Sequence, residues 1–143
     1  MAYYGYHRIS TKEQHLDRGI IEIERFCESQ KIKLERIFTD KITGKNFDRP
    51  RYTVLIEDVL RSGDTLIITE LDRLGRNKRE ILKQLRILEE KGVRVMVLEL
   101  PTTLIDLSQM ENNLAKMMIE TINSVLIEIY ASLTQAEMEK KEK

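Results

Sequence analysis

The chain has 143 residues, 41% hydrophobic and 34% charged, a composition typical of one globular domain rather than of a disordered or fibrous chain. Its 24 basic residues balance its 24 acidic ones, which excludes a generally basic protein that coats nucleic acid but leaves room for a local basic site. The single cysteine, Cys27, excludes an internal disulfide framework, and no membrane span or signal peptide is evident, so we expect a cytoplasmic protein.

Short apolar strands alternate with amphipathic helices through the first two thirds of the chain. The predicted strands are residues 2–7, 34–39, 65–69 and 93–98, and the predicted helices are residues 12–30, 51–61 and 78–91. Residues 40–51 form a polar loop and residues 71–77 a turn, with Asn77 as the N-cap of the third helix and Gly92 as its end. This alternation predicts an α/β fold with a central, mostly parallel sheet of four to five strands, flanked by helices.

The last third of the chain reads as one long helix, residues 107–140, which would span about 50 Å. An apolar stripe recurs along it every three or four residues: Met110, Leu114, Met118, Ile122, Val125, Ile129 and Leu133. A domain of this size covers only part of such a stripe, so we expect the rest to pack on a partner subunit. The expected division is therefore an α/β domain, residues 1–106, and a long helix for dimerisation, residues 107–143.

Polar residues follow the ends of several predicted strands. Arg8 and Ser10 are two apart at the end of the first strand, so they project to the same side. Asp72, Arg73 and Arg76 follow the third strand. The loop before the second helix adds further cations: Lys45, Arg49 and Arg51. Carboxyl ends of parallel strands share one edge of the sheet, where open α/β sheets bind ligands.

Guanidinium groups at this edge suit a phosphate oxyanion, and a serine supplies an oxygen nucleophile. The pattern therefore points to phosphoryl transfer through a covalent phosphoserine. Taken alone, Ser10 also fits a helix N-cap, and each arginine fits a solvated surface. His7 lies three residues before Ser10, so strand alternation places it on the other face and disfavours a Ser/His pair. The sequence contains no phosphate-binding glycine loop and no dinucleotide-binding fingerprint. His7 and His15 lack the neighbouring carboxylates or cysteines that a metal site needs.

Three ordered segments, YGYHRISTKEQ (4–14), FTDKITGKNFDRP (38–50) and ITELDRLGRN (68–77), resemble the catalytic domain of the serine site-specific recombinases, the resolvase/invertase family. The resemblance implies that Ser10 attacks a DNA phosphate and stays joined to the 5′ end. It implies that the scissile phosphate is held by Arg8, Arg49, Arg73 and Arg76. Asp72 would orient these arginines, with Gln14 and Asp40 supporting the site. Neither a metal nor ATP is implied.

The same resemblance implies double-stranded DNA as partner and a homodimer that assembles into a tetramer for strand exchange. Relatives carry a DNA-reading domain after the long helix, so we expect that this chain is cut short before one. The sequence departs from the family pattern at two places in its predicted helices. Many relatives have a glutamine shortly after the Leu-Asp of the first helix, where this chain has Arg18-Gly19 after Asp17. Small resolvases usually have arginines after Gln-Ala-Glu, where this chain has Met138, Glu139 and Lys140. Two other functions remain open at this point, a catalytically silent dimerising module of the same fold and an unrelated small-molecule phosphotransferase.

Overall fold

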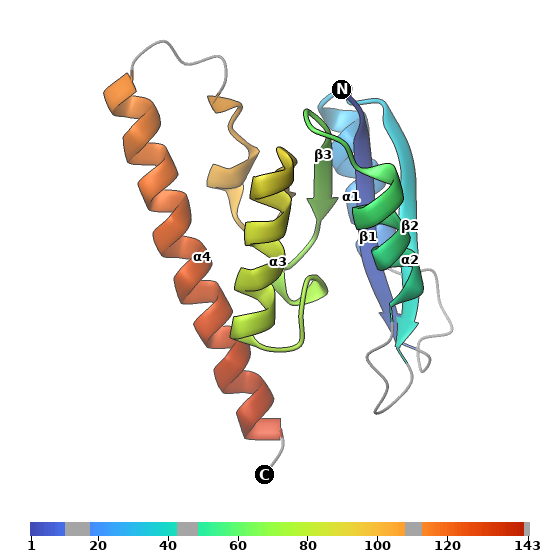
Figure 1. Ribbon diagram of the computed structural model, residues 1–143, viewed down its shortest axis with the longest axis vertical. Coiled ribbons are helices and arrows are strands. Elements are labelled where there is room, and N and C mark those ends of the chain that lie inside the picture. The colour runs from blue at the N-terminus through green and yellow to red at the C-terminus, as the bar shows by residue number, and fades with distance from the viewer. Residues whose placement is uncertain (11–17, 43–48, 108–112, 142–143) are drawn as a thin grey trace.

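The computed structural model describes residues 1–10, 18–42, 49–107 and 113–141, and within them the chain forms a four-stranded, entirely parallel sheet (Figure 1). The strands lie in the order β2-β1-β3-β4 and are β1 (Tyr3–Ser10), β2 (Leu34–Ile42), β3 (Thr65–Ile68) and β4 (Arg94–Val97). The predicted α/β class is confirmed. Because β2 and β3 lie on opposite sides of β1, the chain changes direction across the sheet at β1, where folds of this type place their ligands.

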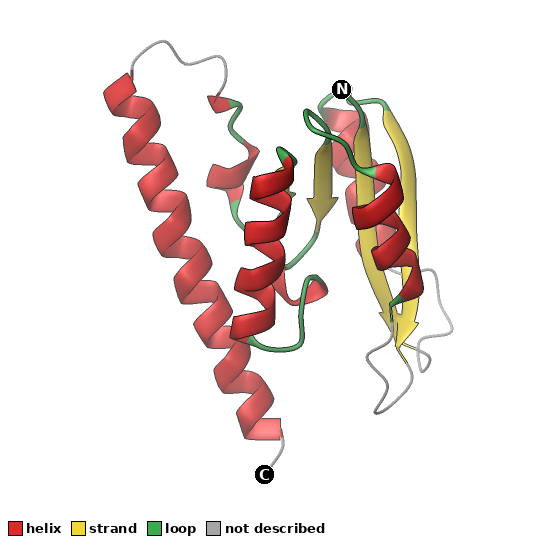
Figure 2. Cartoon of the chain, in the orientation of Figure 1, coloured by secondary structure: helices red, strands yellow, loops and turns green. Residues whose placement is uncertain are grey.

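Helices cover both faces of the sheet (Figure 2). Helix α1 (Arg18–Ser29) packs on one face. On the other face lie α2 (Pro50–Val54), which continues as a π-helical turn, η1 (Leu55–Val59), and α3 (Lys78–Lys91). The long α4 (Asn113–Lys141) packs along α3 on the outside of this layer. Two short 3-10 helices, η2 (Leu71–Arg73) and η3 (Pro101–Leu104), follow β3 and β4.

Alternation along β3 divides the core into two clusters. Leu66 and Ile68 belong to the cluster beneath α2, α3 and α4, whereas Ile67 belongs to the cluster beneath α1. All four residues of β3 are buried, as expected for a strand covered on both faces. The side to which a β1 or β2 residue points therefore decides which helices it meets.

Strand β1 pairs with β3 only over its first three residues, Tyr3–Gly5. Their register runs from Tyr3 opposite Thr65 to Gly5 opposite Ile67, whereas β1 pairs with β2 as far as Ser10. Beyond Gly5 the β1–β2 ribbon continues past the end of β3 (Figure 1). The space between their carboxyl ends is the place where side chains from distant segments meet.

Several predicted boundaries shift. The first strand runs to Ser10 rather than to residue 7, and the second runs to Ile42, so the prediction that a loop begins at Asp40 is wrong. The reason is non-local: β1 and β2 continue their backbone ladder, with Arg8 opposite Asp40, although the side chains become polar. The second helix begins at Pro50 and ends at Val59.

Helix α3 matches its prediction at both ends. Asn77 accepts a hydrogen bond from the Glu80 N–H at 2.8 Å, and Gly92 has φ 81°, the left-handed conformation that ends helices. The other two helices are described from Arg18 and from Asn113, and Leu107 lies outside α4. The predictions for residues 12–17 and 108–112 lie outside the described residues.

Candidate active site

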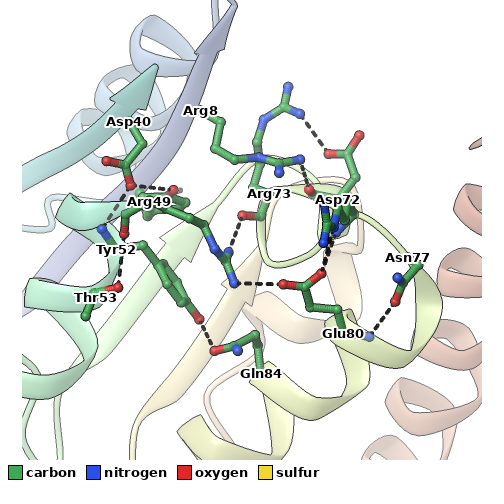
Figure 3. Close-up of polar contacts among 12 residues, drawn as sticks. Arg8, Asp40, Arg49, Tyr52, Thr53, Asp72, Arg73, Asn77, Glu80 and Gln84 are labelled. Atoms are coloured by element: carbon green, nitrogen blue, oxygen red, sulfur yellow. Dashed lines mark hydrogen bonds and ion pairs between the residues drawn. The ribbon is translucent and has the colours of Figure 1, made fainter. Parts of the chain in front are cut away.

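The fold brings most of the predicted site residues to one edge of the sheet (Figure 3). Arg8 lies near the carboxyl end of β1, and Ser10 is its last residue, opposite Ile42 of β2. Asp72 and Arg73 lie in η2, directly after β3. Segments more than 60 residues apart in sequence thus meet at the carboxyl edge of the sheet, where the sequence predicted a ligand site.

Arg8 spans the gap between β1 and η2. Its Nη2 donates a hydrogen bond to the backbone carbonyl of Asp72. Burial lowers the pKa of this guanidinium, while the neighbouring Asp72 carboxylate opposes that effect. A cation held at this depth carries little water of its own, so it interacts strongly with any anion that reaches it.

Asp40 anchors the start of α2. Its carboxylate is 3% exposed and accepts three hydrogen bonds, from the Tyr6 hydroxyl at 2.8 Å and from the backbone N–H groups of Arg51 and Tyr52, each at 2.9 Å. Burial and then this hydrogen bond raise the pKa of Tyr6 well above its usual range. Asp40 thereby fixes the helix end at which Arg49 occupies the N-cap position.

Arg49 crosses from α2 to the η2 loop. Its guanidinium carbon lies 4.1 Å from the centroid of the Tyr52 ring, and Nη1 donates to the carbonyl oxygen of Arg73 at 3.4 Å. Nη2 forms an ion pair with Oε1 of Glu80 at 3.6 Å. Tyr52 is held in turn by a hydrogen bond to Gln84 at 2.9 Å. This largely buried arginine therefore links the β2 side of the site to the β3 side.

Arg73 has a partner at each of its three side-chain nitrogens. Nη1 donates to Oδ1 of Asp72 at 2.8 Å, Nη2 lies 4.0 Å from Oε1 of Glu70, and Nε donates to Nδ1 of His7 at 3.2 Å. Arg76 is the most open of the four arginines, at 61% exposed, and its Nε pairs with Oε2 of Glu80 at 3.7 Å. Glu80 thus holds two of the four predicted phosphate ligands.

Among the residues of this network that the sequence reasoning missed are His7, Glu80 and Glu99. Glu99 follows β4 and accepts the Leu71 N–H at 2.9 Å, which anchors the first residue of η2; burial raises its pKa. A signal existed for Glu80, because an Asn followed three residues later by Glu resembles a capping box and places that carboxylate near Arg76. His7 was correctly placed on the face opposite Arg8, but its contact with Arg73 has no local signature.

The remaining predicted residues divide into two groups. Arg51 does not extend toward Arg8: its guanidinium lies over the Phe38 ring, 5.0 Å from the centroid. Gln14 and Lys45 lie outside the described residues. In the described part of the chain, no three histidine, cysteine or carboxylate side chains are close enough to hold a metal ion. Within the same ranges, no helix is long and apolar enough to cross a membrane.

The outward face of α4 carries most of the predicted stripe. Six of its members are 45–67% exposed: Leu114, Met118, Ile122, Val125, Ile129 and Leu133. Met110 lies outside the described residues. The flank that faces the core is formed by Leu126, Ile127, Tyr130 and Ala131. The helix is tied to α3 by an ion pair from Lys78 to Glu128 at 2.7 Å, so an ordered helix presents the apolar face.

Comparison with known proteins gives consistent matches. The sequence model of the family described as "Resolvase, N terminal domain" matches residues 3–143. A resolvase/recombinase of Pseudomonas putida is 29% identical over 125 residues, which cover 87% of this chain and 63% of that protein. The transposon Tn3 resolvase of Escherichia coli is 34% identical over 99 residues, covering 69% and 51%. The chain thus spans about half to three fifths of the length of these relatives.

Two solved structures share the fold. The N-terminal catalytic domain of TP901-1 integrase superposes with a TM-score of 0.59 at 23% identity, covering 90% of this chain and 98% of that one. A resolvase family site-specific recombinase from Streptococcus pneumoniae gives a TM-score of 0.58 at 20% identity, covering 100% and 99%. At these identities the likeness concerns the fold.

Proposed function

Since the chain belongs to the resolvase family, matching its N-terminal domain over nearly its full length, we propose that it is the catalytic part of a site-specific DNA recombinase. The observation that carries the proposal is the arginine cluster at the carboxyl edge of β1 and β3, beside the strand that ends in Ser10. The substrate is double-stranded DNA, and the reacting group is one backbone phosphodiester on each strand.

In the proposed reaction, Ser10 Oγ loses its proton and forms a bond to phosphorus. The bond between phosphorus and the 3′ oxygen breaks, and that oxygen leaves as a hydroxyl after gaining a proton. The 5′ phosphate stays esterified to the serine. Rejoining is the reverse attack by a 3′ hydroxyl, and the serine ester retains the energy of the broken bond, so the cycle needs no ATP.

The arginines act on the charge that develops on the phosphate. Arg8, Arg49, Arg73 and Arg76 bind its non-bridging oxygens in this proposal, and paired guanidinium N–H groups match that geometry. Asp72 orients Arg73 through the 2.8 Å hydrogen bond. Asp40 acts further away, by fixing the helix end that carries Arg49. Gln14 supports the nucleophile, and Lys45 and Arg51 contact the flanking DNA backbone.

Assembly forms the second half of the proposal. Residues 1–106 supply the chemistry, and residues 107–143 pair two copies through the exposed apolar face of α4, with Met110 as a further predicted contact. Two dimers then join as a tetramer, so that four serines cut four strands before the ends exchange. The exposed positions of α4 support this, because a stripe of seven apolar side chains in water, Met117 among them, usually marks an interface.

A covalent trapping assay tests the proposal. The chain is fused at its carboxyl end to a zinc-finger module and offered a labelled library of spacers flanked by two module sites, then denatured. We expect a DNA band retained on protein that is lost in Ser10→Ala and reduced at least a hundredfold in Arg73→Ala. Confirmed occupancy and tetramer formation without an adduct would instead identify a catalytically silent dimerising module.

A further inference from the structure

His7 is a buried imidazole that the proposed chemistry does not use. It lies in β1 next to Arg8, is 2% exposed, and points to the α1 side of the sheet. Its Nδ1 nevertheless accepts the hydrogen bond from Nε of Arg73, 66 residues away. The imidazole thus contacts the arginine cluster from the α1 face of the sheet, beyond the point where β1 and β3 stop pairing.

Helix α1 leaves room for the ring at one position, Gly19. An ideal Cβ built there would lie 2.2 Å from Cε1 of His7 and 2.6 Å from its Nδ1, far inside contact distance. Gly19 is a buried helical residue without a positive φ, and alanine is the better helix former. The glycine is therefore explained by the ring that it accommodates, and the two residues act as a pair.

The contact also fixes the state of the imidazole. Nε of arginine always carries a hydrogen and cannot accept, so Nδ1 of His7 must be the acceptor. A neutral imidazole that accepts at Nδ1 carries its proton on Nε2. Protonation of Nδ1 would turn the acceptor into a donor facing a permanent cation and would end the interaction.

We propose that His7 is a positioning residue that holds the Arg73 guanidinium in its phosphate-binding orientation; this rests on the proposed role of Arg73 in DNA cleavage. Asp72 fixes one end of the guanidinium and His7 fixes Nε, so the plane of the group is set by two contacts from two different strand ends. An unrestrained arginine side chain has many rotamers, and fixing one of them costs conformational entropy. If the side chain is already ordered before the phosphate binds, this entropy is not lost during the reaction. The five N–H groups of a guanidinium leave donors for the phosphate beyond these two contacts.

Two variants distinguish the role of His7 as a hydrogen-bond acceptor from its role in filling space. In the fusion protein, His7→Asn places an amide oxygen close to the position of Nδ1, whereas His7→Leu fills similar space without an acceptor. At saturating DNA we expect adduct formation about tenfold slower in His7→Leu, the effect of losing one hydrogen bond, and within about threefold of the unmodified rate in His7→Asn. DNA affinity should be unchanged in both. Equal rates in His7→Leu and the unmodified protein, or equal losses in both variants, would overturn the inference.

Arg73→Ala separates this inference from the proposed function. An unmodified fusion that forms no adduct refutes both, whereas an inactive Arg73→Ala beside a fully active His7→Leu refutes the role of His7 alone. A second measurement needs no cleavage: the ring nitrogens of the chain's two histidines can be observed by NMR and assigned with His15→Gln. We expect the Nε2–H tautomer for His7 at neutral pH and a shift of its Nδ1 signal in Arg73→Ala. An Nδ1–H tautomer would contradict the contact.

The steric pair gives a further check. Gly19→Ala should slow cleavage by displacing the ring and should lower the melting temperature. Adding His7→Ala should restore the melting temperature, because the small side chain no longer meets the new Cβ, but should leave cleavage slow. Should Gly19→Ala fail to fold, the His7 variants and the NMR measurement still decide the matter. Independent, additive effects of the two substitutions on stability would show that the ring does not lie over Gly19.

Discussion

Asp40→Asn is a sharp test of how the fold holds the active-site edge together. The Asp40 carboxylate lies almost wholly inside the protein and accepts hydrogen bonds from the Tyr6 hydroxyl and from two backbone N–H groups at the start of α2. The asparagine keeps one acceptor oxygen, which can serve the Arg51 N–H. Its amide NH2 then faces the Tyr52 N–H and the Tyr6 hydroxyl, so two donors lose their acceptor.

The expected cost follows from those contacts. A hydrogen bond to a charged group contributes about 1.5–3 kcal/mol, and a buried donor left without its acceptor costs about 1–3 kcal/mol. We therefore expect Asp40→Asn to lower the free energy of unfolding by about 3 kcal/mol, because the Tyr6 hydroxyl can reorient whereas the Tyr52 N–H cannot. Tyr6→Phe removes only one of the three hydrogen bonds, a bond to a charged acceptor, and should cost about 2 kcal/mol.

Urea unfolding at neutral pH measures both values, with the exposed Asp58→Asn as a matched control that should stay within about 0.5 kcal/mol of the unmodified chain. In the trapping assay, Asp40→Asn should also slow cleavage at temperatures where the chain is folded, because the helix end that carries Arg49 is loosened. A loss below about 1 kcal/mol for Asp40→Asn would show that the carboxylate does not anchor α2.

Three further predictions follow from other features. Burial raises the pKa of Tyr6 and of Tyr52, so these hydroxyls stay protonated in the folded chain while the unfolded chain loses both protons near pH 10. Their contribution to stability should hold below pH 10 and fall by up to about 2.7 kcal/mol per pH unit above it. Burial also raises the pKa of the Cys27 thiol, so part of the loss begins at lower pH; Tyr6→Phe should make the fall above pH 10 shallower, and a pH-independent urea midpoint would contradict the argument. Glu80→Gln removes the ion pair that Glu80 forms with each of Arg49 and Arg76, so DNA affinity measured by fluorescence anisotropy should rise about threefold at low salt. An unchanged or lower affinity would show that Glu80 does not compete with DNA phosphates for these two arginines. Ile122→Asp should shift the chain toward monomer in sedimentation without lowering its melting temperature, whereas Ala131→Asp should unfold it; the reverse pattern would mean that the two faces of α4 are wrongly assigned.

Features encoded locally were predictable from the sequence. Helix α3 was placed to the residue because Asn77 and Gly92 mark its ends by their own chemistry. The apolar positions of α4 were found for a similar reason, since a helical period shows in one segment. The period alone does not say which flank meets the core: the small Ala131 is buried against the domain, while the larger Leu133 is 57% exposed.

Features that depend on pairing between distant segments were not predictable in this way. Asp40 looks like a loop residue in the sequence. In the structure β1 extends to Ser10, and its backbone pairs with β2 as far as Ile42, so Asp40 lies within a strand. The same holds for His7, whose partner at Arg73 is brought close only by the sheet order. Residue type and position at a strand end were enough to propose the site residues, whereas the carboxylates and the imidazole that contact them could be recognised only from the fold.

The charge of the site explains how a neutral chain can hold a phosphate. Four arginines and the three carboxylates that pair with them, Glu70, Asp72 and Glu80, meet at this edge, a formal excess of one positive charge, while the whole chain has 24 of each sign. An excess of this size acts over about one Debye length, roughly 10 Å at 0.1 M salt. In the proposed function it would therefore stabilise a phosphate already at the site but would not attract DNA from a distance. Because the whole chain has no net charge, we expect it to neutralise few phosphates outside the site and to bind DNA weakly by itself.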